Sequence, residues 1–276
     1  MQRFCFVIGY DGTDFAGSQI QPGRRTVQGE LERVVQQVAP GSGRLIFAGR
    51  TDRGVHAVGQ VVSGDVAWGG TTEELRAALN AVAPFDLVVA RVSVASPTFH
   101  ARFDAQRREY RYRIHIAAAP PVLERRFVWW RRRPLNAELA QQACAAFIGR
   151  RNFGSFAGMG RSRAKDAMSL VRTVYACDWH VDGVAADVSP SGSAEERHEL
   201  RVVADGFLPN MVRNMTTAIR VVAEGERPVA WVYDVLSAVE RSLVGEAAPP
   251  HGLTLHRVWY GDVEQLPDAL GAQVGE

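Results

Sequence analysis

The sequence predicts an α+β protein made of two ferredoxin-like halves, each an antiparallel sheet with helices on one face. Over residues 4–94, strand and helix patterns follow the order strand, helix, strand, strand, helix, strand. After residue 103 the same order begins again, with one helix added. We therefore divide the chain into residues 1–104 and 105–276 and expect the functional cleft between these halves.

In the first half, strands show apolar alternation and helices show apolar residues at helical spacing. Thr26 is placed to cap the first helix and Thr72 the second. The predicted elements are a strand, a polar loop, a helix, two strands, a helix and a strand, at residues 4–10, 17–25, 26–38, 44–48, 55–62, 72–82 and 87–94.

The second half repeats the order without visible sequence identity to the first. Its predicted strands are at residues 107–116, 170–181, 200–203 and 253–260. Its predicted helices are at residues 136–147 and 207–222, with another starting at Pro228. We expect disorder at residues 189–193, which are rich in Ser and Gly, and in the last ten residues.

Composition excludes several classes of protein. The three cysteines are far apart in sequence, so they predict neither a disulfide framework nor a zinc site, and we expect a cytoplasmic protein. No apolar run has the length of a membrane span, and the N-terminal run is too short for a signal peptide. Phosphate-loop, dinucleotide-binding and zinc-protease motifs are absent, so we expect no cofactor and no metal.

Positive charge is concentrated in the middle of the chain. Residues 102–172 contain 16 Lys and Arg against 5 Asp and Glu, a net charge of +11, whereas the rest carries 16 against 25, a net of −9. Nearly all of these cations are arginines, which bind phosphate with two parallel hydrogen bonds and stack on bases. This pattern favours a nucleic-acid surface, although a solvated arginine-rich face is the plainer alternative.

One carboxylate stands out by its position. Asp52 lies between two predicted strands in the sequence Gly-Arg-Thr-Asp-Arg-Gly, with Arg50 and Arg53 beside it. An Asp on a glycine-flanked loop is presented rather than packed, and it can act as a nucleophile. The same residues are also ordinary turn chemistry, so local sequence alone leaves both interpretations open.

Three stretches of the chain can be compared with known sequence motifs. The first is Gly-Arg-Thr-Asp-Arg-Gly-Val-His-Ala at residues 49–57. The second runs from Phe-His-Ala-Arg-Phe at 99–103 into Arg-Arg-Glu-Tyr-Arg-Tyr at 107–112, and the third is Phe-Leu-Pro-Asn-Met-Val-Arg-Asn at 207–214. All three resemble motifs of the TruA family of tRNA pseudouridine synthases, and weaker matches near both ends extend the resemblance over nearly the whole chain.

The resemblance implies a cofactor-independent isomerase, acting as a cytoplasmic homodimer on uridines 38–40 in the anticodon stem-loop of tRNA. It implies that Asp52 is catalytic, that Tyr110 stacks on the target base and that Arg213 pairs with the catalytic carboxylate. Arg50 would fill the gap left by the flipped nucleotide. Two departures stand out: Ser18 replaces a common Trp and Thr217 a common Gly. They put the RNA contacts of one loop and one helix-packing detail in question.

Two other functions fit parts of this pattern. A non-catalytic RNA-binding protein would use the bare sheet faces and the basic segment, with Asp52 serving only as a turn residue. An N-glycosidase would use one Asp to attack the sugar and would release the free base. Product formation and base release separate these functions from an isomerase.

Overall fold

The computed structural model describes residues 1–158, 170–184 and 195–261. Two compact units are present, Met1–Arg108 together with the segment from Leu255 onward, and Glu109–Thr254. The expected α+β class with mostly antiparallel strands is confirmed. The disorder expected at residues 189–193 and in the last ten residues lies outside the described residues.

The first unit is built on four neighbouring strands. Their order is β4-β1-β3-β10, for β1 (Gln2–Tyr10), β3 (His56–Val66), β4 (Leu87–Val94) and β10 (Leu253–Tyr260). The strand β1 pairs antiparallel with both β3 and β4, and Phe6 lies opposite Val62 and Val92. The short β2 (Ile46–Phe47) pairs with β3 and covers less than the expected residues 44–48.

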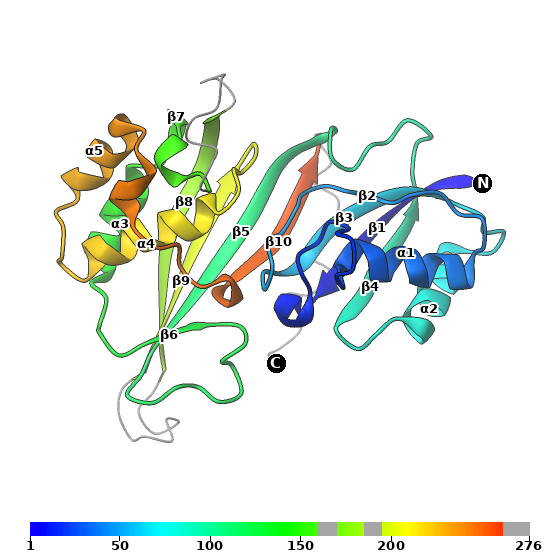
Figure 1. Cartoon of the computed structure of the whole chain (residues 1–276), viewed down its shortest axis with the longest axis horizontal. Helices are drawn as coiled ribbons and strands as arrows, with labels where there is room; N and C mark the ends of the chain where they lie inside the picture. The colour runs from blue at the N-terminus through cyan, green and yellow to red at the C-terminus, as the bar shows by residue number, and fades with distance from the viewer. Residues whose placement is uncertain (159–169, 185–194, 262–276) are drawn as a thin grey trace. The chain divides into compact units, whose positions relative to one another are not determined.

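Two helices cover one face of this unit. The helix α1 (Val27–Val38) begins after Thr26, whose hydroxyl accepts the Gly29 N–H, as predicted. The helix α2 (Thr72–Val82) is capped by Thr71, not Thr72, because Glu74 reaches back to the Thr71 N–H and completes a capping box. Figure 1 shows the two helices side by side on the strands.

The second unit has the strand order β5-β9-β8-β7. These strands are β5 (Ala105–Ile116), β7 (Gly149–Asn152), β8 (Val171–Val184) and β9 (Glu195–Ala204). The short β6 (Trp129–Arg131) pairs parallel with β5. The sequence patterns did not predict β6 and β7, because strands of three or four residues are too short to show a period.

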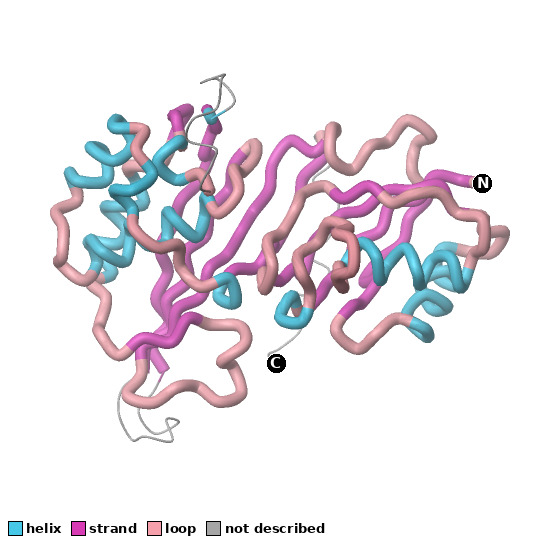
Figure 2. Tube along the Cα trace, in the orientation of Figure 1, coloured by secondary structure: helices cyan, strands magenta, loops and turns pink. Residues whose placement is uncertain are grey.

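Three helices gather on one side of this second group of strands: α3 (Ala137–Ala145), α4 (Met211–Ala223) and α5 (Ala230–Ala238) (Figure 2). The helix α4 starts four residues later than the expected Phe207. Proline disfavours helical backbone at the preceding Leu208, and Asn210 adopts the left-handed region at φ 60°. No helix in the described part of the chain is long and apolar enough to cross a membrane.

Acidic residues from outside the basic segment neutralise several of its arginines. Glu199 on β9 pairs with Arg111 at 3.2 Å and with Arg113 at 3.0 Å. Glu224, at the end of α4, has a side chain only 1% exposed and pairs with Arg131 of β6 and with Arg220 at 2.5 Å. The sequence count of +11 therefore overstates the positive charge that is free to meet a ligand.

The Glu224 cluster ties β6 to the end of α4. Burial pushes the pKa of Glu224 upward, but hydrogen bonds from Arg131 and Arg220 outweigh it, so the pKa is below its ordinary value. A lowered folded-state pKa means that this carboxylate stabilises the fold above its unfolded pKa. That stabilisation is lost as the pH falls through the folded-state value.

We predict that Glu224→Gln loses about 1–3 kcal/mol of unfolding free energy at neutral pH, since it leaves the half-buried Arg131 and Arg220 without their counter-charge. Its stability should also change less than that of the unsubstituted protein between pH 5 and pH 3. Denaturant unfolding at several pH values measures both effects. Glu138→Gln on α3, an exposed position, is the matched control. Equal losses in the two variants would contradict a structural role for the cluster.

Candidate active site

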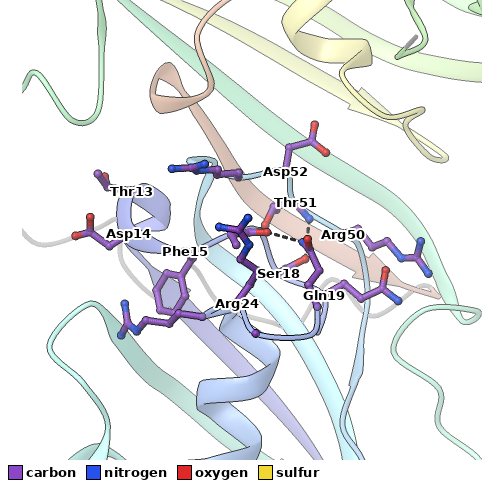
Figure 3. Close-up of a pocket in the computed structure, with 15 residues that line it drawn as sticks. Thr13, Asp14, Phe15, Ser18, Gln19, Arg24, Arg50, Thr51 and Asp52 are labelled. Atoms are coloured by element: carbon purple, nitrogen blue, oxygen red, sulfur yellow. Dashed lines mark hydrogen bonds between the residues drawn. The ribbon is translucent and has the colours of Figure 1, made fainter. Parts of the chain in front are cut away.

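Asp52 opens a tight turn that joins β2 to β3. The Val55 N–H donates to the Asp52 carbonyl oxygen at 3.1 Å and closes the turn. Gly54 sits at φ 79°, a left-handed conformation that side chains disfavour. Asp52 itself is half-buried and lies at the edge of a cavity (Figure 3). The backbone around Asp52 thus forms a turn, and the Asp52 carboxylate projects from that turn beside the cavity.

Thr51 fixes the backbone immediately before the carboxylate. Its N–H donates to the Ser18 hydroxyl at 2.8 Å, and its carbonyl accepts the Ser18 N–H at 3.0 Å. Its hydroxyl lies 2.8 Å from the Tyr10 hydroxyl. Burial raises the pKa of Tyr10 to about 12, with the hydrogen bonds to Thr51 and Gln60 opposing the shift. Ser18, which replaces a family Trp, therefore supplies a buried acceptor for this loop.

Gln60 on β3 holds the other side of the loop. Its side chain is fully buried, and its amide nitrogen donates to the Gly49 carbonyl at 2.9 Å. Its amide oxygen accepts the Gly49 N–H at 3.4 Å. Gln60 was not predicted as a site residue, although a single amide within an apolar strand is the pattern that could have revealed it.

The segment after Tyr10 packs directly against the end of the turn. A Cβ atom on Gly12 would lie 2.0 Å from the Val55 carbonyl oxygen, so only glycine fits there. The Gly12 N–H donates to His56 Nδ1 at 2.9 Å. His56 is therefore a buried positioning side chain on β3.

A cavity of about 730 Å³ lies between this turn and the loop that follows β1 (Figure 3). The residues around it are Thr13, Asp14, Phe15, Ala16, Gly17, Ser18, Gln19, Gln21, Gly23, Arg24, Arg25, Arg50, Thr51, Asp52 and Arg53. Among the described residues, no group of three or more His, Cys, Asp or Glu side chains could hold a metal ion. The lining is polar and rich in arginine.

Arg25 anchors the wall of the cavity. Its guanidinium donates to both carboxylate oxygens of Asp86, at 2.7 and 2.9 Å, and lies 4.2 Å from the centre of the Phe15 ring. The hydrogen bond to Asp86 raises the pKa of Arg25. This arginine is therefore committed to structure, whereas Arg50, Arg24 and Arg53 are exposed at the same cavity.

Tyr110 lies on β5 in the second unit and is 7% exposed. Its ring meets Phe207 edge to face, with centroids 5.0 Å apart. Tyr112, two residues further along the strand, is fully buried and donates to the Pro249 carbonyl at 2.8 Å. Burial raises the pKa of Tyr112 well above its ordinary value, against the opposing charge of Arg213.

Arg213 lies in the first turn of α4 and is half-buried. Its Nε donates to the Ala248 carbonyl at 2.6 Å and its Nη1 to the Asn210 side-chain oxygen at 2.8 Å. Two nitrogens of the guanidinium plane are thus held by fixed acceptors. The left-handed backbone of Asn210 belongs to the same arrangement.

Thr217, the second departure from the family pattern, supports this arrangement from one turn away. Its hydroxyl lies 3.2 Å from the Arg213 carbonyl and donates to the Glu246 carbonyl at 2.8 Å. The Ala248 N–H in turn donates to the Arg213 carbonyl at 3.3 Å. Thr217, where Gly is common in the family, thus ties α4 to residues 246–248, the segment that orients Arg213.

The four residues singled out from the sequence divide between the units. Asp52 and Arg50 line one cavity in the first unit. Tyr110 and Arg213 belong to the second unit, each held by neighbours within that unit. The positions of Ser18, Gln60 and Arg24 at the site were not predicted from the sequence.

Comparison with known proteins gives consistent matches. Residues 7–104 and 143–261 match the family model described as tRNA pseudouridine synthase. A Geobacillus kaustophilus protein named tRNA pseudouridine synthase A is 39% identical over 262 residues, covering 95% of each chain. The protein of that name from Bacillus subtilis is 35% identical over 262 residues, covering 94% of this chain and 99% of its own.

The matched regions contain Asp52 and Arg213 but not Tyr110, and relatives align over almost the full length of the chain. The chain therefore belongs to the tRNA pseudouridine synthase family.

Proposed function

We propose that this chain isomerises uridine to pseudouridine at positions 38–40 in the anticodon stem-loop of tRNA. The observation that carries the proposal is the Asp52 carboxylate, which lies on a turn directly after Thr51, a residue held by hydrogen bonds to Ser18 and Tyr10. Membership of the family supplies the reaction class and tRNA as the substrate. The exact positions follow from the resemblance to TruA proteins.

The reaction breaks the bond between ribose C1′ and base N1, turns the base and joins C1′ to C5. The proton on C5 is lost and N1 gains one, so that the net change is an isomerisation without cofactor. Asp52 supplies the nucleophile. The base must leave its helix first, which costs a few kcal/mol and is offset by contacts with phosphates.

Arg213 pairs with the Asp52 carboxylate in this proposal. This pairing is supported by the fixed orientation of the Arg213 guanidinium, because Ala248 and Asn210 accept hydrogen bonds from two of its nitrogens. A fixed guanidinium binds a carboxylate with less loss of side-chain entropy than a mobile one. Arg50, exposed beside Asp52, fills the space that the flipped nucleotide leaves.

Tyr110 stacks on the detached base and keeps it in the site. Its edge-to-face contact with Phe207 fixes the ring plane, as a stacking surface requires.

We further propose that the protein has two ferredoxin-like halves with the catalytic cleft between them, and that it acts as a homodimer, as the resemblance implies. A cytoplasmic location fits the three free cysteines.

The hydroxyl of Ser18 should matter for turnover more than for affinity. Ser18→Ala leaves the buried Thr51 N–H without its acceptor, at a cost of about 1–3 kcal/mol. We expect a melting temperature lower by several degrees and slower single-turnover conversion, with the tRNA dissociation constant within about twofold. Ser237→Ala, at an exposed position on α5, is the control. Identical rates and melting temperatures in both variants would remove Ser18 from the loop's support.

Asp52→Asn should abolish turnover while tRNA affinity stays within about tenfold, or 1.4 kcal/mol. The amide keeps the shape of the side chain but is a poor nucleophile. Asp234→Asn, an exposed position on α5, should behave as the unsubstituted protein. Pseudouridine formation in tRNA transcripts and filter binding measure the two quantities.

Residual turnover by Asp52→Asn near the unsubstituted rate would exclude Asp52 as the nucleophile. Release of free uracil by the unsubstituted protein would indicate an N-glycosidase. Binding of tRNA without any product from either protein would indicate a non-catalytic RNA-binding protein.

The hydroxyl and the ring of Tyr110 should have separable roles. Tyr110→Phe keeps the stacking face and the packing on Phe207, so it should bind tRNA normally. If the hydroxyl removes the C5 proton, as we expect, the Phe variant turns over at least about a hundredfold slower. Tyr110→Leu should lose both affinity for the flipped base and turnover.

Single-turnover rates at saturating enzyme on one tRNA make this comparison, with Tyr233→Phe on the exposed side of α5 as control. Equal rates for Tyr110→Phe and the unsubstituted protein would eliminate the proton-transfer role. Equal rates for Tyr110→Leu would eliminate Tyr110 from the site.

A further inference from the structure

Several arginines of the first unit pair with carboxylates. Away from the cavity, Arg3 pairs with Asp65 at 2.8 Å and Arg76 with Glu73 at 2.5 Å. Unlike these, three arginines of the cavity are exposed and have no acidic partner within the described residues. These are Arg24, Arg50 and Arg53.

The cavity favours an anion over a base. Its one aromatic ring, Phe15, is already covered by the Arg25 guanidinium at 4.2 Å, so no free ring is left for stacking. The remaining lining offers guanidinium and amide donors, the groups that match phosphate oxygens. Asp14 and Asp52 also line the cavity and repel an anion, so a phosphate group would bind at the arginine side chains and away from these two carboxylates.

Arg24 and Arg53 both project from backbone that hydrogen bonds hold in place. The Arg24 N–H donates to the Gln21 carbonyl at 3.2 Å, and the next residue, Arg25, is anchored to Asp86. Arg53 lies inside the turn closed by the Asp52 to Val55 hydrogen bond. Holding the backbone in advance lowers the entropy lost when a ligand binds.

We propose that Arg24 and Arg53 bind phosphate groups of the tRNA strand that carries the target uridine, without reading its bases. This inference rests on the proposed function, because an RNA substrate is what brings a row of phosphates beside Asp52. Phosphate contacts set the register and orientation of a nucleic acid on a protein. The two arginines thus position the strand while Asp52 reacts.

The salt dependence of tRNA binding tests this assignment. Each phosphate contact contributes about 0.7–0.9 to the slope of log affinity against log salt concentration. Arg24→Gln and Arg53→Gln should each lower that slope by about 1, and the double variant by about 2. Between 50 and 200 mM salt, the affinity of each single variant should therefore fall about fourfold less than that of the unsubstituted protein.

Three comparisons accompany the slopes. Arg44→Gln, exposed in the same unit but away from the cavity, should leave the slope unchanged. Arg24→Lys keeps the charge and should retain most of the slope. Single-turnover rates at subsaturating enzyme should fall in both glutamine variants in proportion to their loss of tRNA affinity, because a contact made equally in substrate and transition state lowers kcat/KM through KM.

The outcomes separate this inference from the function on which it rests. If the unsubstituted protein makes no pseudouridine, the proposed function fails. If it makes pseudouridine but the glutamine variants keep the full slope, or match Arg44→Gln, only the phosphate assignment fails. A third outcome is that inorganic phosphate weakens tRNA binding more than another salt of equal ionic strength, that Arg24→Gln removes this effect, and that the salt slopes for tRNA stay unchanged. The cavity is then a site for a free anion, and the proposal is overturned.

Discussion

The hydrogen bonds through Thr51 are the constraint on which the rest of the site depends. One residue connects β1 through Tyr10, the loop after β1 through Ser18, and the turn that carries Asp52. Because Thr51 is buried, each of these bonds is protected from competition with water. The carboxylate is half-exposed, yet the backbone behind it is part of the core. A nucleophile has to be accessible and fixed in position, and this arrangement provides both.

The arginines of this protein differ in whether they have an acidic partner, and that difference does not follow from their position in the sequence. Arginines of β5 and β6 are largely committed to Glu199 and Glu224, which come from the acidic part of the chain. Those pairs tie strands and a helix together. At the cavity near Asp52, by contrast, the guanidinium groups of Arg24, Arg50 and Arg53 are exposed without acidic partners among the described residues. Part of the free positive charge thus lies beside the candidate nucleophile, in a region that the sequence count marks as net negative.

Long elements with a clear period were predictable from the sequence, and so was the loop that presents Asp52. The start of α4 was not, because apolar spacing continues back to Phe207 while Pro209 and the left-handed Asn210 prevent the helix from forming there. Thr71 and Thr72 are both plausible caps, and the reach of Glu74 decides between them. Ser18 and Thr217 appeared only as departures from a pattern. Their roles depend on contacts with residues far along the chain, which local sequence does not encode.

The most direct test of the central claim is to map pseudouridine in tRNA after incubation with the purified protein. The substrate is an unmodified transcript with uridines at positions 38–40, and the readout is chemical mapping of each uridine along the strand. The account predicts new pseudouridine in the anticodon stem-loop, full retention of the base and no requirement for an added cofactor. Unchanged uridine at all three positions, or strand positions that have lost their base, would contradict it.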